Sequence, residues 1–258
     1  MTLYFKYMRL LLKAQMQYRA SFILLAVGQC LTPFTVFAGL YFMFERFGQI
    51  KGWDFYEVML CFAITHMAFS ITECFARGFD MFSSLVVNGD FDRLLVRPRG
   101  TIIQVLGSRF EFSRVGRLFL GTAVLIWTIV KLDTDWTFLK ALTLVLMLAC
   151  GIIIFTGIFI LSASISFWTV QGLEIANIFT DGGREMSQYP LDIYHIRIQQ
   201  FFTFIIPFGC ANYLPLQYIL DRQDNPWYAL TPLAGLMFLA PCLLIWRTGV
   251  RRYRSTGS

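Results

Sequence analysis

The sequence predicts an all-α membrane protein with six transmembrane helices, and three observations support this fold class. Of the 258 residues, 57% are hydrophobic and only 15% are charged, whereas a soluble domain carries about 25% charged residues. The mean hydropathy is +0.59. Six apolar stretches are about as long as the roughly 20 residues that a helix needs to cross a bilayer. This composition argues against a soluble enzyme, a disordered chain and a disulfide scaffold.

Residues 1–19 precede the first apolar stretch and are predicted to form an amphipathic helix that lies in the membrane interface. Lys6, Arg9 and Lys13 fall on one helical face, and leucines cover much of the remainder. The alternative is a basic flank that only orients the first span. The apolar run that follows, residues 21–44, is too long for a cleaved signal peptide, whose apolar core has about 7–15 residues.

The predicted spans cover approximately residues 20–44, 55–77, 112–131, 138–168, 199–220 and 227–246. Pro207 and Pro215 interrupt the fifth, and each removes a backbone hydrogen bond from a helix. Irregular backbone at membrane depth occurs where it faces protein or a water-filled cavity. We therefore favour a gate or a re-entrant outer segment at 199–220 over a straight helix.

The distribution of basic residues predicts that both termini are cytoplasmic. With six spans, 17 of the 22 Lys and Arg residues fall on the side of the N-terminus, as the positive-inside rule requires. The other five are Arg46, Lys51, Lys131, Lys140 and Arg222. Because the basic residues flank span ends, where they meet anionic headgroups, we expect membrane lipids and no nucleic acid as partners.

The loop between spans two and three, residues 80–101, is predicted to carry a short helix. Asn88-Gly89 marks a turn, and Asp90 is placed to cap the helix that follows. Phe91, Leu94 and Leu95 then share one face, and Pro98 ends the helix. A helix of one or two turns is not stable alone, so its apolar side chains would need a partner to dock on. The alternative is a loop packed on the protein's own helices.

The six-span pattern, the segment Gly-Asp-Phe-Asp-Arg-Leu-Leu-Val-Arg-Pro at 89–98 and the proline-rich fifth span resemble one family. They are similar to the permease subunits of bacterial type-2 (ABC-2 type) ATP-binding-cassette exporters. The stretch 204–215 and Tyr189-Pro190 also look like that family's fifth span and the segment before it. The resemblance covers nearly the whole chain, and the match at 89–98 is its most specific part.

This resemblance implies a single transmembrane permease domain, residues 1–258, in a multi-pass protein of the bacterial cell (inner) membrane. In the family, the loop after span two is the coupling helix that docks on a separate ATPase subunit. The residues that would match the coupling motif here are Gly89, Asp90, Asp92, Leu94, Leu95, Arg97 and Pro98. The chain lacks a Gly-x-x-x-x-Gly-Lys-[Ser/Thr] phosphate loop, so ATP and Mg²⁺ would be bound by the partner ATPase, and no cofactor or metal is expected in this chain. A second permease half, identical or paralogous, is also implied.

Polar residues within the spans are candidates for a translocation path or a dimer interface, because ionisable groups are costly in a membrane. His66, Ser70, Glu73 and Arg77 fall on one face of span two, and Glu73 and Arg77 are spaced to pair. Pro207, Asn212 and Pro215 of span five are assigned to the same role. The alternative is structural: a salt bridge that secures the helix end, and a hydrogen bond from His66 to a neighbouring helix.

Four charged residues, Arg109, Glu111, Arg114 and Arg117, precede span three. If a helix begins near Thr101, it runs for about 30 residues, or roughly 45 Å, and exceeds the hydrocarbon core of about 30 Å. We then expect Arg114 and Arg117 to extend to the headgroups. The alternative is a moving arm that transmits force.

Catalysis by this chain is not expected, since there is no H-E-x-x-H or G-x-S-x-G motif and the two histidines, His66 and His195, lie in different segments. Six cysteines without a C-x-x-C spacing predict buried thiols rather than a metal or redox site. An ATP-independent secondary transporter or channel is the alternative function, although neither inverted repeats nor a filter motif is visible. For an exporter, the substrate class stays open among drugs, peptides, lipids and glycans.

Overall fold

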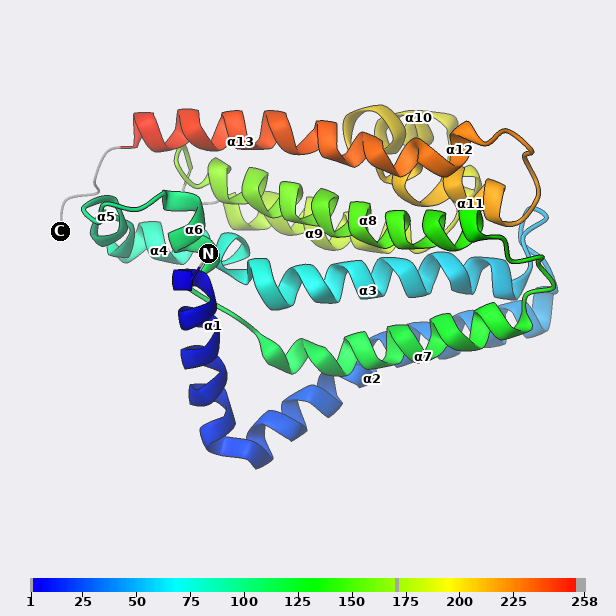
Figure 1. Cartoon of the computed structure of the whole chain (residues 1–258), viewed down its shortest axis with the longest axis horizontal. Coiled ribbons are helices and arrows are strands. Elements are labelled where there is room, and N and C mark those ends of the chain that lie inside the picture. The colour runs from blue at the N-terminus through cyan, green and yellow to red at the C-terminus, as the bar shows by residue number, and fades with distance from the viewer. Residues whose placement is uncertain (1, 170–171, 254–258) are drawn as a thin grey trace.

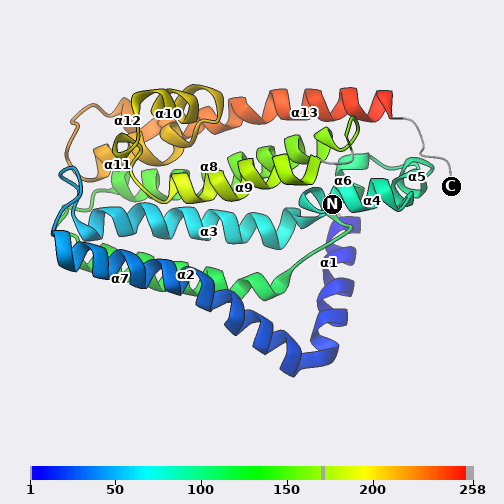
Figure 2. The same cartoon turned by 180° about the vertical axis from the view of Figure 1, so that it is seen from behind.

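The computed structural model describes residues 2–169 and 172–253, and within these ranges the chain is helical with no β-strand. Figures 1 and 2 show long helices that run side by side along one axis, with α1 across it. Five helical runs contain stretches long and apolar enough to cross a membrane. They are built on α2 (Arg19–Phe47), α3 (Phe55–Asp80), α7 (Val115–Lys131), α8 (Phe138–Ile165) and α13 (Ala234–Arg252).

Short helices gather at one end of the bundle, which we call the α5 end. They are α4 (Phe82–Val87), α5 (Asp90–Leu95), α6 (Thr101–Leu106) and the 3₁₀ turn η2 (Phe112–Arg114). The beginning of α1 and the end of α13 lie at this end too (Figure 1). The opposite end carries the loop of residues 48–54, together with α12 (Trp227–Leu230) and η6 (Thr231–Leu233). We call it the loop end.

Helix α1 (Thr2–Gln15) lies across the bundle axis and joins α2 through the turn η1 (Met16–Tyr18). Its inner face packs Tyr7 and Leu11 against a small cluster around Phe110 and Phe112. Lys6, Arg9 and Lys13 are exposed on the outer face. Phe5, Leu10 and Leu12 are exposed as well, so α1 has one face packed on the protein and an outer surface that is both basic and apolar.

Helix α9 (Gly172–Ser187) occupies a place that the sequence did not predict. It packs along α8 and α3, and its last residue, Ser187, accepts a 2.8 Å hydrogen bond from Thr65 in the middle of α3. Five residues later, Asp192 accepts a 2.9 Å hydrogen bond from Trp53 at the loop end. Helix α9 therefore runs along the bundle from one end toward the other, between the stretches 138–168 and 199–220 that the sequence predicts as spans.

The segment expected to be the fifth span, residues 199–220, begins near the loop end of the bundle and returns to it. The turn η3 (Leu191–Ile193) precedes it. The segment itself contains the end of α10 (Ile196–Gln200), the π-helical turns η4 (Phe201–Ile205) and η5 (Gly209–Tyr213), and α11 (Leu214–Ile219). Asp192 before it and Arg222 after it both contact the loop end, at Trp53 and Glu57. A full crossing at 199–220 is therefore wrong, and the segment follows the re-entrant path that the prolines favoured.

The two prolines of this segment act differently. Pro207 follows Ile206, whose backbone is extended (φ −115°, ψ 100°), and so separates η4 from η5. Pro215 lies in the first turn of α11, directly after η5, and Tyr213 and Leu214 before it keep helical dihedral angles. Only Pro207 breaks the helical path, and the predicted break at Pro215 does not occur.

The predicted 30-residue helix from Thr101 is also wrong. Helix α6 ends at Leu106, where the N–H of Gly107 closes the last turn, and α7 begins only at Val115. Between them, Phe110 turns inward and is 2% exposed. Burial of this ring against α1 holds the chain in a connecting loop instead of a continuous helix.

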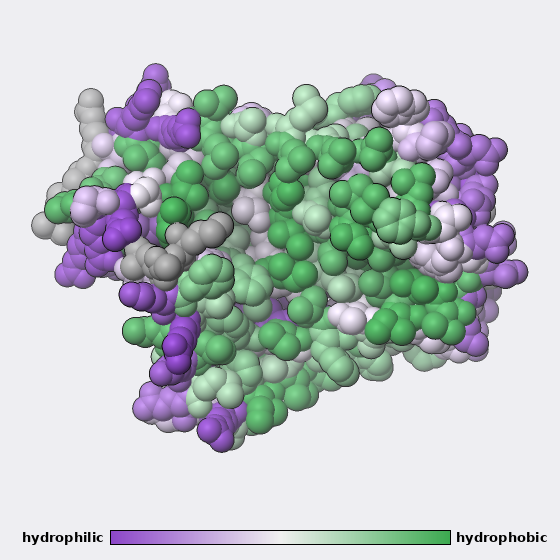
Figure 3. All heavy atoms as spheres, viewed as in Figure 1, coloured by the Kyte–Doolittle hydropathy of each residue, from purple (hydrophilic) through white to green (hydrophobic). Residues whose placement is uncertain are grey.

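Close helix contacts fix α2 and α6 to the bundle. A Cβ atom at Gly116 of α7 would collide with the carbonyl oxygen of Ala26 in α2, and one at Gly78 of α3 would collide with that of Val105 in α6. Small residues that allow such approach are typical of packing inside a membrane. Hydrophobic side chains cover the middle of the face in Figure 3, and hydrophilic ones gather at the two ends and along α1. This distribution fits a protein embedded in a bilayer.

Candidate functional site

The carboxylate of Glu73, in the C-terminal half of α3, is the centre of a buried ion cluster. Its Oε2 accepts a 2.6 Å hydrogen bond from Nη1 of Arg117, and its Oε1 lies 3.3 Å from both Arg77 and Arg114. Glu73 is 4% exposed and Arg117 is 5% exposed. The predicted Glu73–Arg77 pair is therefore present, but as one part of a larger cluster. Such an arrangement is expected for buried charge, which needs several partners to offset its desolvation.

Two further groups extend this Glu73 cluster to other elements. Glu111 lies 2.9 Å from Arg114 and 3.4 Å from Nε of Arg77. The amide oxygen of Gln29 in α2 accepts hydrogen bonds from both Arg114 and Arg117, the latter at 3.0 Å. The cluster thus ties α2, α3 and the start of α7 together through side chains alone.

The expectation that Arg114 and Arg117 extend to the headgroups is wrong. Both guanidinium groups point inward to Glu73, with side-chain exposures of 13% and 6%. The reason is that the turn η2 and α7 pack directly on α3, so the first arginines of α7 reach the carboxylate before they reach solvent.

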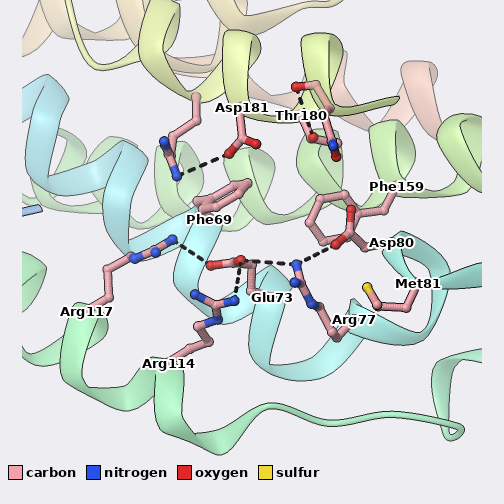
Figure 4. Close-up of a pocket in the computed structure, with 12 residues that line it drawn as sticks. Phe69, Glu73, Arg77, Asp80, Met81, Arg114, Arg117, Phe159, Thr180 and Asp181 are labelled. Carbon is pink, nitrogen blue, oxygen red and sulfur yellow. Dashed lines mark hydrogen bonds and ion pairs between the residues drawn. The ribbon is translucent and has the colours of Figure 1, made fainter. Parts of the chain in front are cut away.

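A cavity of about 340 Å³ lies beside the Glu73 cluster and is shown in Figure 4. Helix α9 forms its far wall with Thr180, Asp181 and Arg184, and Arg184 pairs with Asp181 at 3.3 Å. The ring of Phe69 lies between two cations, with Arg117 at 5.7 Å and Arg184 at 5.1 Å from its centroid. Cations placed over aromatic faces are stabilised by the ring quadrupole, so Phe69 links the charged groups of α7 and α9.

The other two predicted polar residues of α3 lie inside the protomer. His66 is 4% exposed, and its Nε2 is 3.1 Å from the side-chain oxygen of Gln188, just after α9. Ser70 is 1% exposed and lies between His66 and Glu73 along the helix. Glu73 and Arg77 line the cavity. His66 instead forms a hydrogen bond with a neighbouring segment, which is the structural role that the sequence offered as the alternative.

Asn212 anchors the re-entrant segment. Its Nδ2 donates to Oγ1 of Thr65 at 2.7 Å and to the carbonyl oxygen of Ser187 at 2.8 Å. Both donors of the amide are therefore used, at the point where α3, α9 and η5 meet. Pro207 and Pro215 are buried in the same segment, and neither lines the Glu73 cavity.

The segment 89–98, which we call the docking segment, carries the predicted short helix α5. Gly89 precedes it with φ 72°, a left-handed conformation that favours glycine. The predicted cap by Asp90 does not form, because Asp90 is already the first helical residue and its carboxylate lies 3.4 Å from Arg93. Burial and the neighbouring Asp92 carboxylate raise the pKa of Tyr253 above its ordinary value.

The docking segment has one buried face and one exposed face. Phe91 is fully buried against the rings of Phe82, Phe167, Trp246 and Tyr253. Leu94 is partly buried, whereas Leu95 is 39% and Val96 is 86% exposed. The expected apolar residues therefore lie on two different faces. Phe91 packs the helix against the protein, whereas Leu95 and Val96 are exposed and could contact a partner.

A side chain of α6 fixes the rest of the docking segment through hydrogen bonds. The side-chain amide of Gln104 donates to the carbonyl oxygens of Leu94 and Arg99, both at 3.0 Å. Arg97 and Pro98 are exposed. A cavity of about 320 Å³ separates the segment from α1 and is lined by Leu10, Leu94, Arg97 and their neighbours.

Sequence reasoning missed Gln29, Asp181 and Arg184 as members of this region. Gln29 carries no such signal, whereas Asp181, Arg184 and Glu185 fall at i, i+3 and i+4, which places them on one helical face. In the described part of the chain, no group of three or more His, Cys, Asp or Glu residues could hold a metal ion.

A comparison with protein families gives one match over most of the chain. A family model described as "ABC-2 family transporter protein" matches residues 30–257. No curated protein and no solved structure matches the chain. The match leaves out α1, η1 and the first part of α2, including Gln29, and it covers the docking segment and the charged residues of the Glu73 cluster.

Proposed function

The chain belongs to the ABC-2 transporter family, and from this premise we propose that it is the permease subunit of an ATP-driven exporter. It is an integral membrane protein, because five of its helical runs are long and apolar enough to span a bilayer. In this proposal it forms half of the translocation pathway in a bacterial cell membrane, is not itself catalytic, and couples to a separate ATPase that binds ATP and Mg²⁺. The class of substrate stays open among drugs, peptides, lipids and glycans.

We propose six crossings formed by α2, α3, α7, α8, α9 and α13, with α10 to α11 re-entrant from the outside. Charge supports this arrangement. Six basic residues lie toward the loop end: Arg46, Lys51, Lys131, Lys140, Arg197 and Arg222. Most other described basic residues lie toward the α5 end, which the positive-inside rule assigns to the cytoplasm. Both termini would then be cytoplasmic, as expected from six crossings.

The observation that supports ATPase coupling best is the division of the docking segment into two faces. A six-residue helix is unstable alone, yet α5 is fixed by the fully buried Phe91 and by Gln104. It therefore presents Leu95 and Val96 in a defined position at the end proposed to face the cytoplasm. A rigid, apolar projection of this kind suits a hydrophobic groove on a partner and can carry force into α4 and α3.

Leu95→Asp tests the proposal. Burial of one leucine contributes about 1.5–3 kcal/mol, and tenfold in affinity corresponds to about 1.4 kcal/mol. We expect at least tenfold weaker ATPase binding, with loss of export and normal membrane insertion. Val87→Asp is the matched control, because Val87 is a 56% exposed apolar residue at the same end but outside α5. If Leu95→Asp keeps full ATPase binding and export, α5 is not the coupling element. Transport by the purified chain without any ATPase subunit would instead favour an ATP-independent transporter or channel.

We propose that the Glu73 cavity belongs either to the translocation path or to the interface with the second permease half, on the side of the α5 end. Asp181 and Glu185 on α9 have side-chain exposures of 58% and 47%. Charged groups at this depth do not face lipid at low cost, so a second permease half or water would cover them. An Asp181→Asn variant that binds the ATPase normally but changes export would support this assignment, and unchanged export would count against it.

A further inference from the structure

A groove of about 490 Å³ lies between α6 and the end of α13, apart from both regions described above. Its floor is apolar and consists of Ile102, Ile103, Trp246 and Val250. Arg247 and Arg251 form its rim. These two arginines are four residues apart on α13, so they project from one face, and both are exposed.

The charges of this rim are uncompensated. No carboxylate among the described side chains pairs with Arg247 or Arg251, in contrast to the arginines of the Glu73 cluster. Two cations that share an apolar groove without a protein anion are complementary to a ligand with a negative head and an apolar tail.

The position along α13 indicates where such a ligand comes from. The chain has no charged residue from Asn225 to Trp246, and Arg247 is the first to follow. An arginine at the boundary of an apolar run lies at headgroup level. Basic pockets between membrane helices on the cytoplasmic side are suited to anionic lipid headgroups.

We propose that this α6–α13 groove binds an anionic phospholipid, with its phosphate on Arg247 and Arg251 and an acyl chain along Ile103 and Trp246. The site is built on the protein's most aromatic layer. Trp246 packs on Phe79, Phe82 and Phe91, and its Nε1 donates to Oγ1 of Thr101 at 3.3 Å. An occupied groove therefore contacts the same ring cluster that holds the docking segment.

The test is native mass spectrometry of the purified full-length chain, titrated with phosphatidylglycerol or with phosphatidylcholine. It needs no ATPase, so its outcome is independent of the proposed export function. We expect preferential binding of phosphatidylglycerol. Two basic residues at a headgroup correspond to roughly a tenfold to thirtyfold change in affinity, so Arg247→Gln with Arg251→Gln should weaken binding by about that factor.

Lys6→Gln with Arg9→Gln is the matched control, since it removes the same charge from exposed positions on α1. We expect it to leave the affinity unchanged, and an equal loss would mean general attraction to anionic lipid and would overturn the site. Gly100→Leu narrows the groove without a change of charge, because Gly100 has φ −61° and open space at its Cβ position. It should also weaken binding. Unchanged affinity in Gly100→Leu, equal binding of phosphatidylcholine, or displacement by millimolar inorganic phosphate would each overturn the proposal.

Discussion

Glu73 on α3 and Arg117 on α7 form a 2.6 Å ion pair in which both side chains are at least 94% buried. The partners are 44 residues apart in the sequence, and their contact closes the bundle at the level where α2, α3 and α7 converge. Around it, three arginines share one carboxylate. Glu73 is thus the shared anion of the cluster, while Glu111 offers Arg77 and Arg114 a second carboxylate.

Glu73→Gln should strongly destabilise the protein. Removal of one partner of a buried ion pair costs about 3–5 kcal/mol because the other charge is left uncompensated, and here three guanidinium groups lose their shared anion. We expect a fall in Tm of roughly 6–20 °C in detergent. Thermal unfolding followed by circular dichroism measures it.

Two variants give this prediction its control. Glu185→Gln removes an exposed carboxylate that forms an ion pair with Arg184 and accepts a hydrogen bond from Gln188, and such surface ion pairs contribute about 0–1 kcal/mol. Glu73→Gln combined with Arg117→Met should recover part of the lost stability, since one uncompensated charge is gone. If the double variant is less stable than Glu73→Gln alone, the cluster is not held by charge compensation.

Gly116→Leu should detach α2 from α7. Any Cβ at Gly116 meets the backbone of Ala26, and overpacking of this kind costs about 1–3 kcal/mol. We expect faster hydrogen exchange throughout α2 and a lower Tm. Gly28→Leu is the control on α2 itself, because its Cβ position faces open space. Equal effects of the two substitutions would show that glycine is needed in these helices for a reason other than this contact.

The position of His195 distinguishes the two topologies. If residues 169–198 were a cytoplasmic segment, a cysteine at 195 would be protected from an impermeant thiol reagent in intact cells. With α9 as a crossing, His195→Cys should react from outside, as should Gln49→Cys, while Asn88→Cys should not. The cysteine-free background requires replacement of all six native cysteines. Protection of residue 195 together with reaction at 49 would exclude α9 as a span.

The sequence was sufficient to predict an all-helical membrane fold, since apolar runs such as 138–168 have few alternative structures. It was not sufficient to place α9, because Asp181, Arg184 and Glu185 lower its hydropathy below that of the proline-broken stretch 199–220. Hydropathy reports contact with lipid, whereas Thr180, Asp181 and Arg184 of α9 line the Glu73 cavity. A helix whose polar side chains face a cavity is missed by such a criterion.

Only the part of the candidate site that lies within one helix could be predicted from the sequence. The pair Glu73–Arg77 follows from spacing within one helix, and it is present at 3.3 Å. The contacts of Arg117 with Glu73 and of Arg184 with Phe69 join residues 44 and 115 positions apart, so no local pattern contains them. In the docking segment, spacing placed Phe91 and Leu95 on one face, but only the arrangement of Phe167 and Trp246 shows that Phe91 is internal.

That division of the docking segment leads to a prediction that separates folding from coupling. Phe91→Ala removes a fully buried ring from contact with four aromatic side chains, and such truncations cost about 3–5 kcal/mol. Leu95→Ala removes a side chain that is 39% exposed, and its effect on stability should be within about 1 kcal/mol. Phe91→Ala should therefore lower the Tm, whereas Leu95→Ala should leave it nearly unchanged.

Binding of the ATPase subunit should follow the other order at a temperature where both variants are folded. Leu95→Ala loses an apolar contact with the partner directly, whereas Phe91→Ala loses only the support beneath α5. Because the amide of Gln104 still holds Leu94 and Arg99 from α6, we expect Phe91→Ala to keep part of its affinity. Isothermal titration of the detergent-purified variants with the ATPase measures both effects. If Leu95→Ala binds normally while Phe91→Ala does not, the partner recognises the aromatic layer around Trp246 and not the exposed face of α5.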